Sequence, residues 1–294
     1  MNADTLRPVV LAAAAHAGAS GNDAHLIRLG HNAIYRLDRA VIARIARVDR
    51  YAVARKEIDV AHWLASMGVP AVRPIDDIDQ PIMVRGHAVT FWHELPPHDN
   101  ANRVELATVL RALHTLPVPE FELPRLDPFE GLADVIENAS GTADGDRDFL
   151  RSHLAELMAR YTALPAGRPQ CVVHGDAWPG NIARTQDGSL LVLDLEQVAV
   201  GPPEWDLLHT AISHATTGTL PERQYQEFCC TYGLDVTGWQ GYPVLRDIRE
   251  LRLALFAVQI AAEDPRQQHQ ARHRLACLRG DLGPRPWSGW TNIP

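Results

Sequence analysis

The chain has 294 residues, 46% of them hydrophobic, which is enough to bury a large core in one domain or two lobes. No apolar run approaches the ~20 residues that span a bilayer, and the N-terminal residues lack the basic start of a signal peptide, so we expect a cytoplasmic protein without a membrane partner. The net charge is −8, with the acidic excess in residues 96–294. An acidic second half argues against nucleic-acid binding; it favours a cationic ligand or serves solubility alone.

Residues 1–95 predict an antiparallel sheet with helices. Hydrophobic spacing and turn residues indicate helices over 6–17 and 52–67 and strands over 25–29, 34–37, 41–45, 81–84 and 88–92. Gly30 and Asn32 lie in the first turn, where a backbone without a Cβ can approach a phosphate, although an ordinary turn has the same composition. A second turn is expected at residues 38–39. Two prolines at residues 96 and 97 end the sheet and indicate a connector.

The remainder of the chain predicts mainly helices. Apolar residues recur at spacings of three and four in residues 103–116, which indicates an amphipathic helix, and a proline-rich loop covers residues 117–128. The expected helices are residues 103–116, 129–139, 148–164, 207–214, 222–232, 246–263 and 265–278. Residues 283–294 are expected to be irregular.

The most informative stretch is residues 171–196. Short apolar runs at 182–184 and 190–193 flank an Asp-Gly pair, which is a strong hairpin signal. Folding the hairpin brings the polar groups at its two ends together. These groups are His174, Asp176 and Asn181 before the hairpin and Asp194 and Glu196 after it. Carboxylate and amide oxygens around one point are ligands that suit Mg²⁺. A plain hairpin with polar ends is the alternative.

The spacing of these residues resembles a known family. Asp176 and Asn181 are separated by four residues, as in the H-R-D-x-x-x-x-N loop of protein kinases, with Gly175 in place of the Arg. His-Gly-Asp, then Asn, then a metal-type Asp is similar to the aminoglycoside phosphotransferase and choline kinase superfamily. The resemblance implies an α+β, bilobal, protein-kinase-like fold, with an antiparallel N-lobe sheet in residues 1–95 and a mainly helical C-lobe in residues 96–294.

The resemblance also implies roles for the central residues. Asp176 would accept the proton of a substrate hydroxyl, and Asn181 and Asp194 would hold Mg²⁺. His174 would orient the loop by hydrogen bonding, and Asp206, which follows within Gly201-Pro-Pro-Glu-Trp-Asp206, would hold that loop in place. Glu196 would assist a second metal or face the substrate.

The phosphoryl donor implied by the resemblance is ATP or GTP. The turn with Gly30 and Asn32 would cover its phosphates, and backbone groups around His93 to Leu95 would pair with the base. Arg44 stands on the strand where kinases carry a Lys, and a guanidinium can grip phosphate through two bonds. Glu57 on the next helix is its expected partner. An exposed strand Arg and a solvated helix Glu are the alternatives.

The acceptor is less constrained by the sequence. By the same resemblance, Glu263 or Asp264 would bind ammonium groups of a substrate. We expect an enzyme that phosphorylates a hydroxyl of a small, cationic molecule such as an aminoglycoside or other antibiotic, with antibiotic resistance as one outcome. A metabolite kinase acting on choline or an amino sugar, and a nucleotide-binding pseudokinase without turnover, remain alternatives. We expect a monomer or a dimer.

Overall fold

The structure is a computed structural model that describes residues 3–30, 32–37, 40–139 and 143–291. Its contacts divide the chain into two compact units. The first contains the described residues of Met1–Asn102 together with Leu116–Pro124 and Pro179–Val198; the second contains Arg103–Thr115, Arg125–Trp178 and Ala199–Pro294, as far as these are described. The single lobe boundary after residue 95 stays a prediction, since contacts alone group the chain differently. The turn predicted at residues 38–39 lies outside the described residues.

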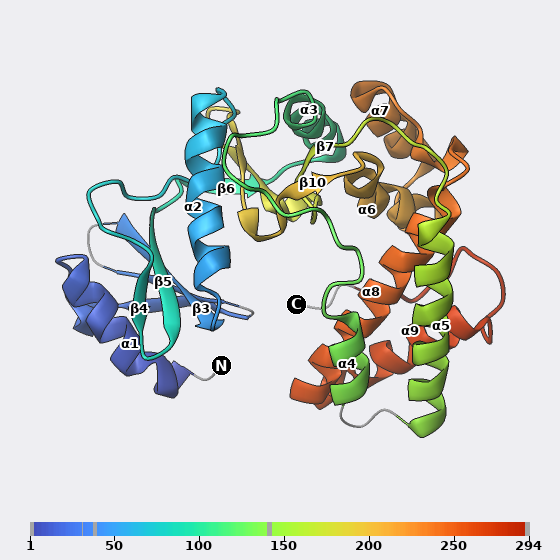
Figure 1. Ribbon diagram of the computed structural model, residues 1–294, viewed down its shortest axis with the longest axis horizontal. Coiled ribbons are helices and arrows are strands. Elements are labelled where there is room, and N and C mark those ends of the chain that lie inside the picture. The colour runs from blue at the N-terminus through green and yellow to red at the C-terminus, as the bar shows by residue number, and fades with distance from the viewer. Residues whose placement is uncertain (1–2, 31, 38–39, 140–142, 292–294) are drawn as a thin grey trace. The chain divides into compact units, whose positions relative to one another are not determined.

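A five-stranded antiparallel sheet forms the centre of the first unit, with strand order β1-β2-β3-β5-β4 (Figure 1). The strands are β1 (His25–Leu29), β2 (Ala33–Arg36), β3 (Val41–Val48), β4 (Ile82–Val84) and β5 (His87–His93). All five match the predicted strands to within a few residues. The antiparallel sheet of the N-terminal region is therefore confirmed.

Helices α1 (Ala3–His16) and α2 (Tyr51–Ser66) cover opposite faces of this sheet (Figure 1). Side chains alternate along a strand, so neighbouring residues of β3 meet different helices. Ala43 and Ile45 join the core formed with α1, whereas Ala46 packs with Ala54 of α2. Arg44 shares the α2 face by the same alternation.

A second, three-stranded sheet in the first unit carries the central hairpin. Its order is β6-β8-β9, from strands β6 (His98–Asn100), β8 (Ile182–Thr185) and β9 (Leu190–Val192). The Asp-Gly turn predicted from the sequence closes the hairpin β8–β9, and Gly188 there has φ +84°. The backbone of Val192 also donates to the carbonyl of Pro70, which ties the hairpin to the segment after α2.

The second unit is mainly helical. Its helices are α3 (Arg103–Leu113), α4 (Leu132–Asn138), α5 (Asp144–Thr162), α6 (Glu204–Ala215), α7 (Glu222–Tyr232), α8 (Tyr242–Glu263) and α9 (Gln268–Arg279). Helix α3 packs on α7, and α8 packs on α5, α6 and α9. A two-stranded sheet pairs β7 (Cys171–Val173) with β10 (Ala199–Gly201). The helix expected from residue 265 begins as a 3₁₀ turn, because Asp264 caps Pro265–Gln267.

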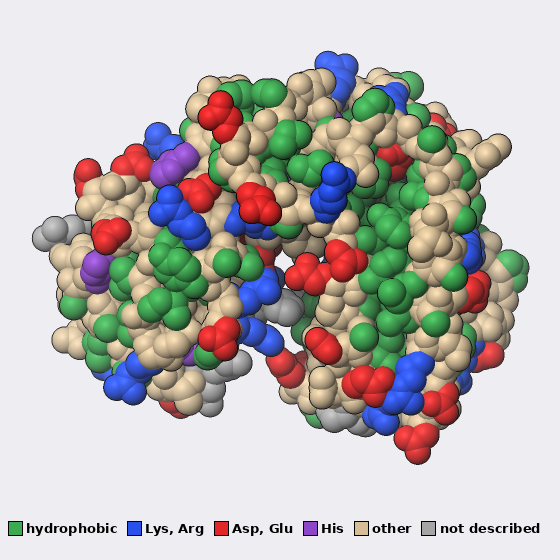
Figure 2. Space-filling model, viewed as in Figure 1, with side chains coloured by type: hydrophobic (Ala, Val, Ile, Leu, Met, Phe, Trp, Pro, Cys, Tyr) green, Lys and Arg blue, Asp and Glu red, His purple; other side chains and the backbone are tan. Residues whose placement is uncertain are grey.

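Two further features are the length and apolarity of the helices and the distribution of charged side chains on the surface. None of the helices among the described residues is long and apolar enough to cross a membrane. On the face drawn in Figure 2, acidic and basic side chains of the described residues are interspersed.

Candidate active site

The predicted catalytic loop, His174-Gly175-Asp176, follows β7 in the second unit. The carboxylate of Asp206, at the start of α6, accepts hydrogen bonds from the backbone N–H of His174 (2.6 Å) and of Gly175 (2.9 Å). Gly175 has φ +83°, which a glycine adopts without steric cost, so the turn explains a glycine at this position. Asp206 therefore lies where the sequence predicted, behind the loop.

Asp206 is fully enclosed, and its bonds keep it charged. The ring Nε2 of His114 lies 2.9 Å from Oδ2 of Asp206, and the side chain of Asp206 is 0% exposed. Burial alone would raise the pKa of Asp206, but the bonds from His114 and from the loop backbone hold it below its usual value. A charged, buried anchor fixes the loop backbone.

Asp176 lies at the end of this loop with a side chain 30% exposed. Its backbone N–H donates to His174 Nδ1 at 3.3 Å, as expected for a histidine that orients the loop. Its Oδ1 accepts a 2.6 Å bond from the guanidinium of Arg249, on α8. Burial would raise the pKa of Asp176, but Arg249 outweighs it and holds the pKa below its usual range. Nothing in the sequence had marked Arg249 as part of the site.

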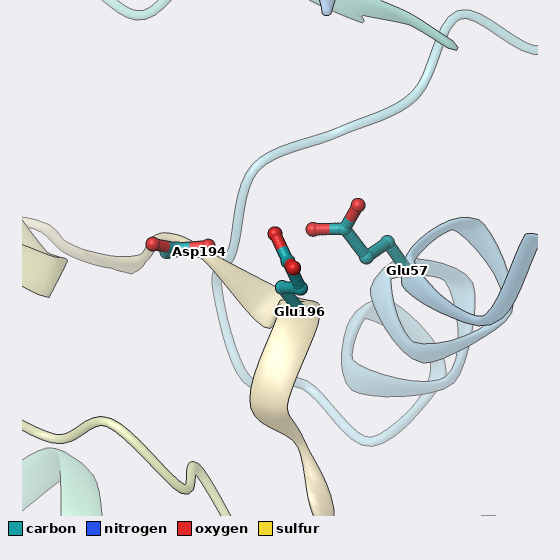
Figure 3. A group of neighbouring side chains, drawn as sticks. All are labelled: Glu57, Asp194 and Glu196. Atoms are coloured by element: carbon teal, nitrogen blue, oxygen red, sulfur yellow. The ribbon is translucent and has the colours of Figure 1, made fainter. Parts of the chain in front are cut away.

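In the first unit, Arg44 gathers three carboxylates. One guanidinium nitrogen contacts Glu57, and the other lies 3.0 Å from Glu196 and 3.3 Å from Asp194. Figure 3 shows the three acids converging, Glu57 from α2 and the other two from the segment after β9. The predicted pairing of Arg44 with Glu57 is confirmed as a contact; its role toward a nucleotide stays a prediction.

The pKa values in this cluster depend on the balance between burial and the neighbouring charges. Desolvation would lower the pKa of Arg44, but the three carboxylates together raise it. Desolvation raises the pKa of Glu57 to about 7 despite the pull of Arg44. The pKa of Glu196 is lowered instead, because the interactions with Arg44 and the other donors to Glu196 outweigh the effect of burial. Arg44 therefore stays protonated and contacts all three acids.

Glu196 receives further donors that the sequence did not reveal. Its carboxylate accepts from the Asn32 side chain at 3.0 Å and from Arg50 at 2.7 Å. Lys56, the one lysine of the chain, donates to the backbone carbonyls of Glu196 and Val198. Donors from the β1–β2 turn, β3 and the start of α2 thus converge on one anion.

The hairpin brings Asn181 and Asp194 together, as predicted. Asn181 precedes β8 and is 7% exposed, and its carbonyl accepts the backbone N–H of Leu193, just before Asp194. Asp194 has φ +53°, a left-handed conformation uncommon for an aspartate and often found at functional positions. Oxygens of Asp194, Glu57 and Glu196 lie within 4.8 Å of one another. Carboxylate oxygens of this kind suit Mg²⁺, and in this cluster they already contact the guanidinium of Arg44.

The remaining predicted residues have simpler surroundings. Gly30 donates its N–H to the carbonyl of Asn32, and His93 donates its N–H to that of Arg73. Leu95 follows the end of β5. Asp264 caps the 3₁₀ turn and pairs with Arg266, which is a structural use of its charge. Glu263 is the last residue of α8, and a substrate role for either acid stays a prediction.

A family model described as "Phosphotransferase enzyme family" matches residues 21–248, more than half of the chain. The chain belongs to this phosphotransferase family. The matched residues include both groups of candidate residues, from the turn at Gly30 to Asp206. The family predicted from the His-Gly-Asp motif is thereby confirmed.

Solved structures of small-molecule kinases share the fold of this phosphotransferase. A choline/ethanolamine kinase family protein from Mesorhizobium loti has 19% identity and a TM-score of 0.63, over 98% of this chain and 97% of that one. Choline kinase LicA from Streptococcus pneumoniae has 15% identity and a TM-score of 0.62, over 93% and 99%. An aminoglycoside phosphotransferase from Streptomyces rimosus has 21% identity and a TM-score of 0.60, over 85% and 99%. A search of curated proteins finds no match. The predicted kinase-like fold is confirmed.

Proposed function

We propose that this phosphotransferase moves the γ-phosphoryl group of ATP or GTP to a hydroxyl group of a small molecule. The observation that carries the proposal is the support of Asp176. Its loop is fixed by a buried Asp206, and the next segment carries Asn181, which the hairpin places beside Asp194. A base and a pair of oxygen ligands in this order are what phosphoryl transfer requires.

Asp176 acts on the acceptor. Its lowered pKa keeps it ionised at neutral pH, so it accepts a hydrogen bond from the hydroxyl and aims that oxygen at the phosphorus. A strong base is unnecessary, because the transition state of phosphoryl transfer is largely dissociative. The proton passes to the Asp176 carboxylate as the new P–O bond forms and the bond to the diphosphate leaving group breaks.

The first unit would hold the donor. Asn181 and Asp194 would hold Mg²⁺, with Glu196 as a further oxygen donor, and a bound metal would neutralise charge at the phosphates. Arg44 would contact the phosphates while Glu57 keeps it in place, and the turn with Gly30 and Asn32 would cover them. Backbone groups from His93 to Leu95 would pair with the base. Related structures support a nucleotide donor: a spectinomycin phosphotransferase is solved with ADP and its antibiotic.

We propose a cationic acceptor, on the strength of the acidic excess in residues 96–294. Aminoglycosides, choline and amino sugars are cationic. The similar structures include choline kinase LicA, an amicoumacin kinase, and an aminoglycoside phosphotransferase in complex with ADP and streptomycin. A pseudokinase is the second candidate, because a Lys is missing from β3. The Arg44–Glu57 contact argues against it, since an arginine held by an acidic side chain stands at that position.

The experiment is release of ADP or GDP by the purified protein with Mg²⁺ across a panel of hydroxyl compounds. The panel contains aminoglycosides, cationic peptide antibiotics, amino sugars, choline and macrolides, and neutral sugars serve as the charge control. We expect acceptor-dependent release from the wild type, strongest with a cationic compound. Release with neutral sugars alone would contradict the cationic acceptor. Mg²⁺–nucleotide binding with no release for any compound would favour the pseudokinase.

A further inference from the structure

Arg249 is a buried arginine that ends on the predicted base. It is 7% exposed on α8, and its Nη2 lies 2.6 Å from Oδ1 of Asp176. Its Nε is also buried and has no hydrogen-bond partner in the described part of the chain. Burying a guanidinium with an unpaired donor costs free energy. The bond from Arg249 to Asp176 offsets part of the free-energy cost of burying this cation.

Arg249 also contacts Trp205, in the first turn of α6. Its guanidinium carbon lies 5.7 Å from the centre of the Trp205 ring, within the range of a cation–π contact. The indole N–H of Trp205 donates to the carbonyl of Gly175 at 2.9 Å, inside the catalytic loop. Trp205 therefore contacts both the loop backbone and the arginine that holds the loop's carboxylate.

We propose that Arg249 is a positioning residue for phosphoryl transfer: together with Trp205 it fixes the Asp176 carboxylate in one orientation and keeps it ionised. The inference rests on the proposed function of Asp176 as the base. Asp206 holds the backbone of the loop, and Arg249 holds the side chain at its end. A bond to the loop backbone does not fix the χ angles of Asp176, whereas the bond from Arg249 to its carboxylate restrains them. Preorganisation of a reacting group is what such a support provides.

Several charged or titratable groups in the described part of the chain interact electrostatically with Asp176. They are His174 in the loop, His209 on α6, and Arg249 and Arg252 on α8. Desolvation and two neighbouring arginines lower the pKa of His209 to about 3, so this ring is neutral at working pH. Arg252 donates from its Nη1 to the carbonyl of Pro128, away from the aspartate. Arg249 contacts the Asp176 carboxylate directly, through the 2.6 Å bond from its Nη2.

The test measures the titration of Asp176 without any acceptor. In protein labelled with ¹³C at aspartate carboxyl carbons, the Asp176 signal is identified by its loss in Asp176→Asn. In Arg249→Met we expect its midpoint to rise by about 1 to 3 pH units, the effect of removing a contacting opposite charge. Arg249→Lys, which returns a cation to the site, restores most of the difference. An unchanged midpoint in folded Arg249→Met overturns the inference.

Turnover then separates positioning from structural support. With an acceptor found by the panel, Arg249→Met should lower kcat by ~10-fold or more and move the acid limb of its pH profile upward, while KM for the nucleotide stays the same. Arg246→Met is the matched control, because Arg246 lies one turn earlier on α8 and pairs with Asp247. A normal kcat in Arg249→Met would refute the inference. A normal rate in Asp176→Asn would instead refute the proposed function and leave the titration result standing.

Discussion

At the scale of single residues, the site depends on charges whose partners are fixed. Arg44 holds three acids, Asp206 holds two backbone N–H groups, and Arg249 holds Asp176. In each case a buried or half-buried ion has a partner that offsets the cost of leaving water. Removing one partner therefore leaves the other ion without the interaction that offsets its burial.

Replacing Arg44 by Met should weaken nucleotide binding. A charge-assisted hydrogen bond to phosphate contributes ~1.5–3 kcal/mol, so we expect the ADP dissociation constant to rise at least ~10-fold in isothermal titration calorimetry. Arg55→Met is the control, because Arg55 forms an exposed pair with Asp59 within α2. Equal ADP affinity in wild type and Arg44→Met would show that Arg44 is only a structural ion-pair partner.

Asp206→Asn should lower the free energy of unfolding by about 3 kcal/mol at pH 7. An amide oxygen is a weaker acceptor than a carboxylate for the loop N–H groups, and a buried donor is left poorly satisfied. The pKa of Asp206 in the folded protein lies below its unfolded value, so its contribution is present above that unfolded value and is lost as pH falls. Denaturant titrations should show a constant gap between the two proteins from neutral pH to about pH 5, and a narrowing gap below about pH 4. A gap that widens in acid would contradict this sign.

At the scale of elements, the hairpin β8–β9 brings the proposed metal ligands together. Its turn needs a left-handed residue, and Gly188 supplies φ +84°, with no atom within 4 Å of the place where a Cβ would stand. The turn therefore demands glycine for its backbone conformation and has space for a side chain.

Gly188→Ala should lower the free energy of unfolding by ~1 kcal/mol, the cost of a left-handed alanine. Gly238→Ala is the matched control, since a Cβ at Gly238 also meets nothing within 4 Å and its φ is not positive. Denaturant unfolding of the two variants should show a loss for the first and no loss for the second. The same loss in both would mean that backbone conformation is not the cause.

The sequence predicted the elements that are marked by residues close together along the chain. The sheet strands and the Asp-Gly turn follow from alternation and turn residues, whereas the pairing of Arg44 with Glu57 was expected from the family resemblance. Strands β6 and β10 were missed because each has three residues and forms only against a distant partner. Arg249 was missed for the same reason, since 73 positions separate it from Asp176 and nothing nearby marks it among the apolar residues of α8.

At the scale of the whole molecule, the proposed catalytic residues are distributed over both units of the chain. Asp176 belongs to the second unit, and Asn181 and Asp194 belong to the first, with the boundary between Trp178 and Pro179. The family match across residues 21–248 includes residues of both units.

Magnesium and nucleotide should stabilise the whole protein together. A ligand that binds the folded state at 100 times its dissociation constant adds about 2.7 kcal/mol, so the thermal midpoint should rise with MgATP or MgGTP. A chelator should remove the metal-dependent part of that rise. In Asp194→Asn the chelator should change little, because the metal ligand is already lost. A midpoint in wild type that responds equally with and without Mg²⁺ would argue against the metal site.

The most direct test of phosphoryl transfer is mass spectrometry of the acceptor after incubation with Mg²⁺ and nucleotide, for wild type and Asp176→Asn side by side. We predict a phosphorylated acceptor with the wild type. We expect at least ~10²-fold less product with Asp176→Asn, the low end for loss of a positioned base, while calorimetry shows the same nucleotide affinity for both proteins. Near-normal product from Asp176→Asn would contradict the proposed mechanism.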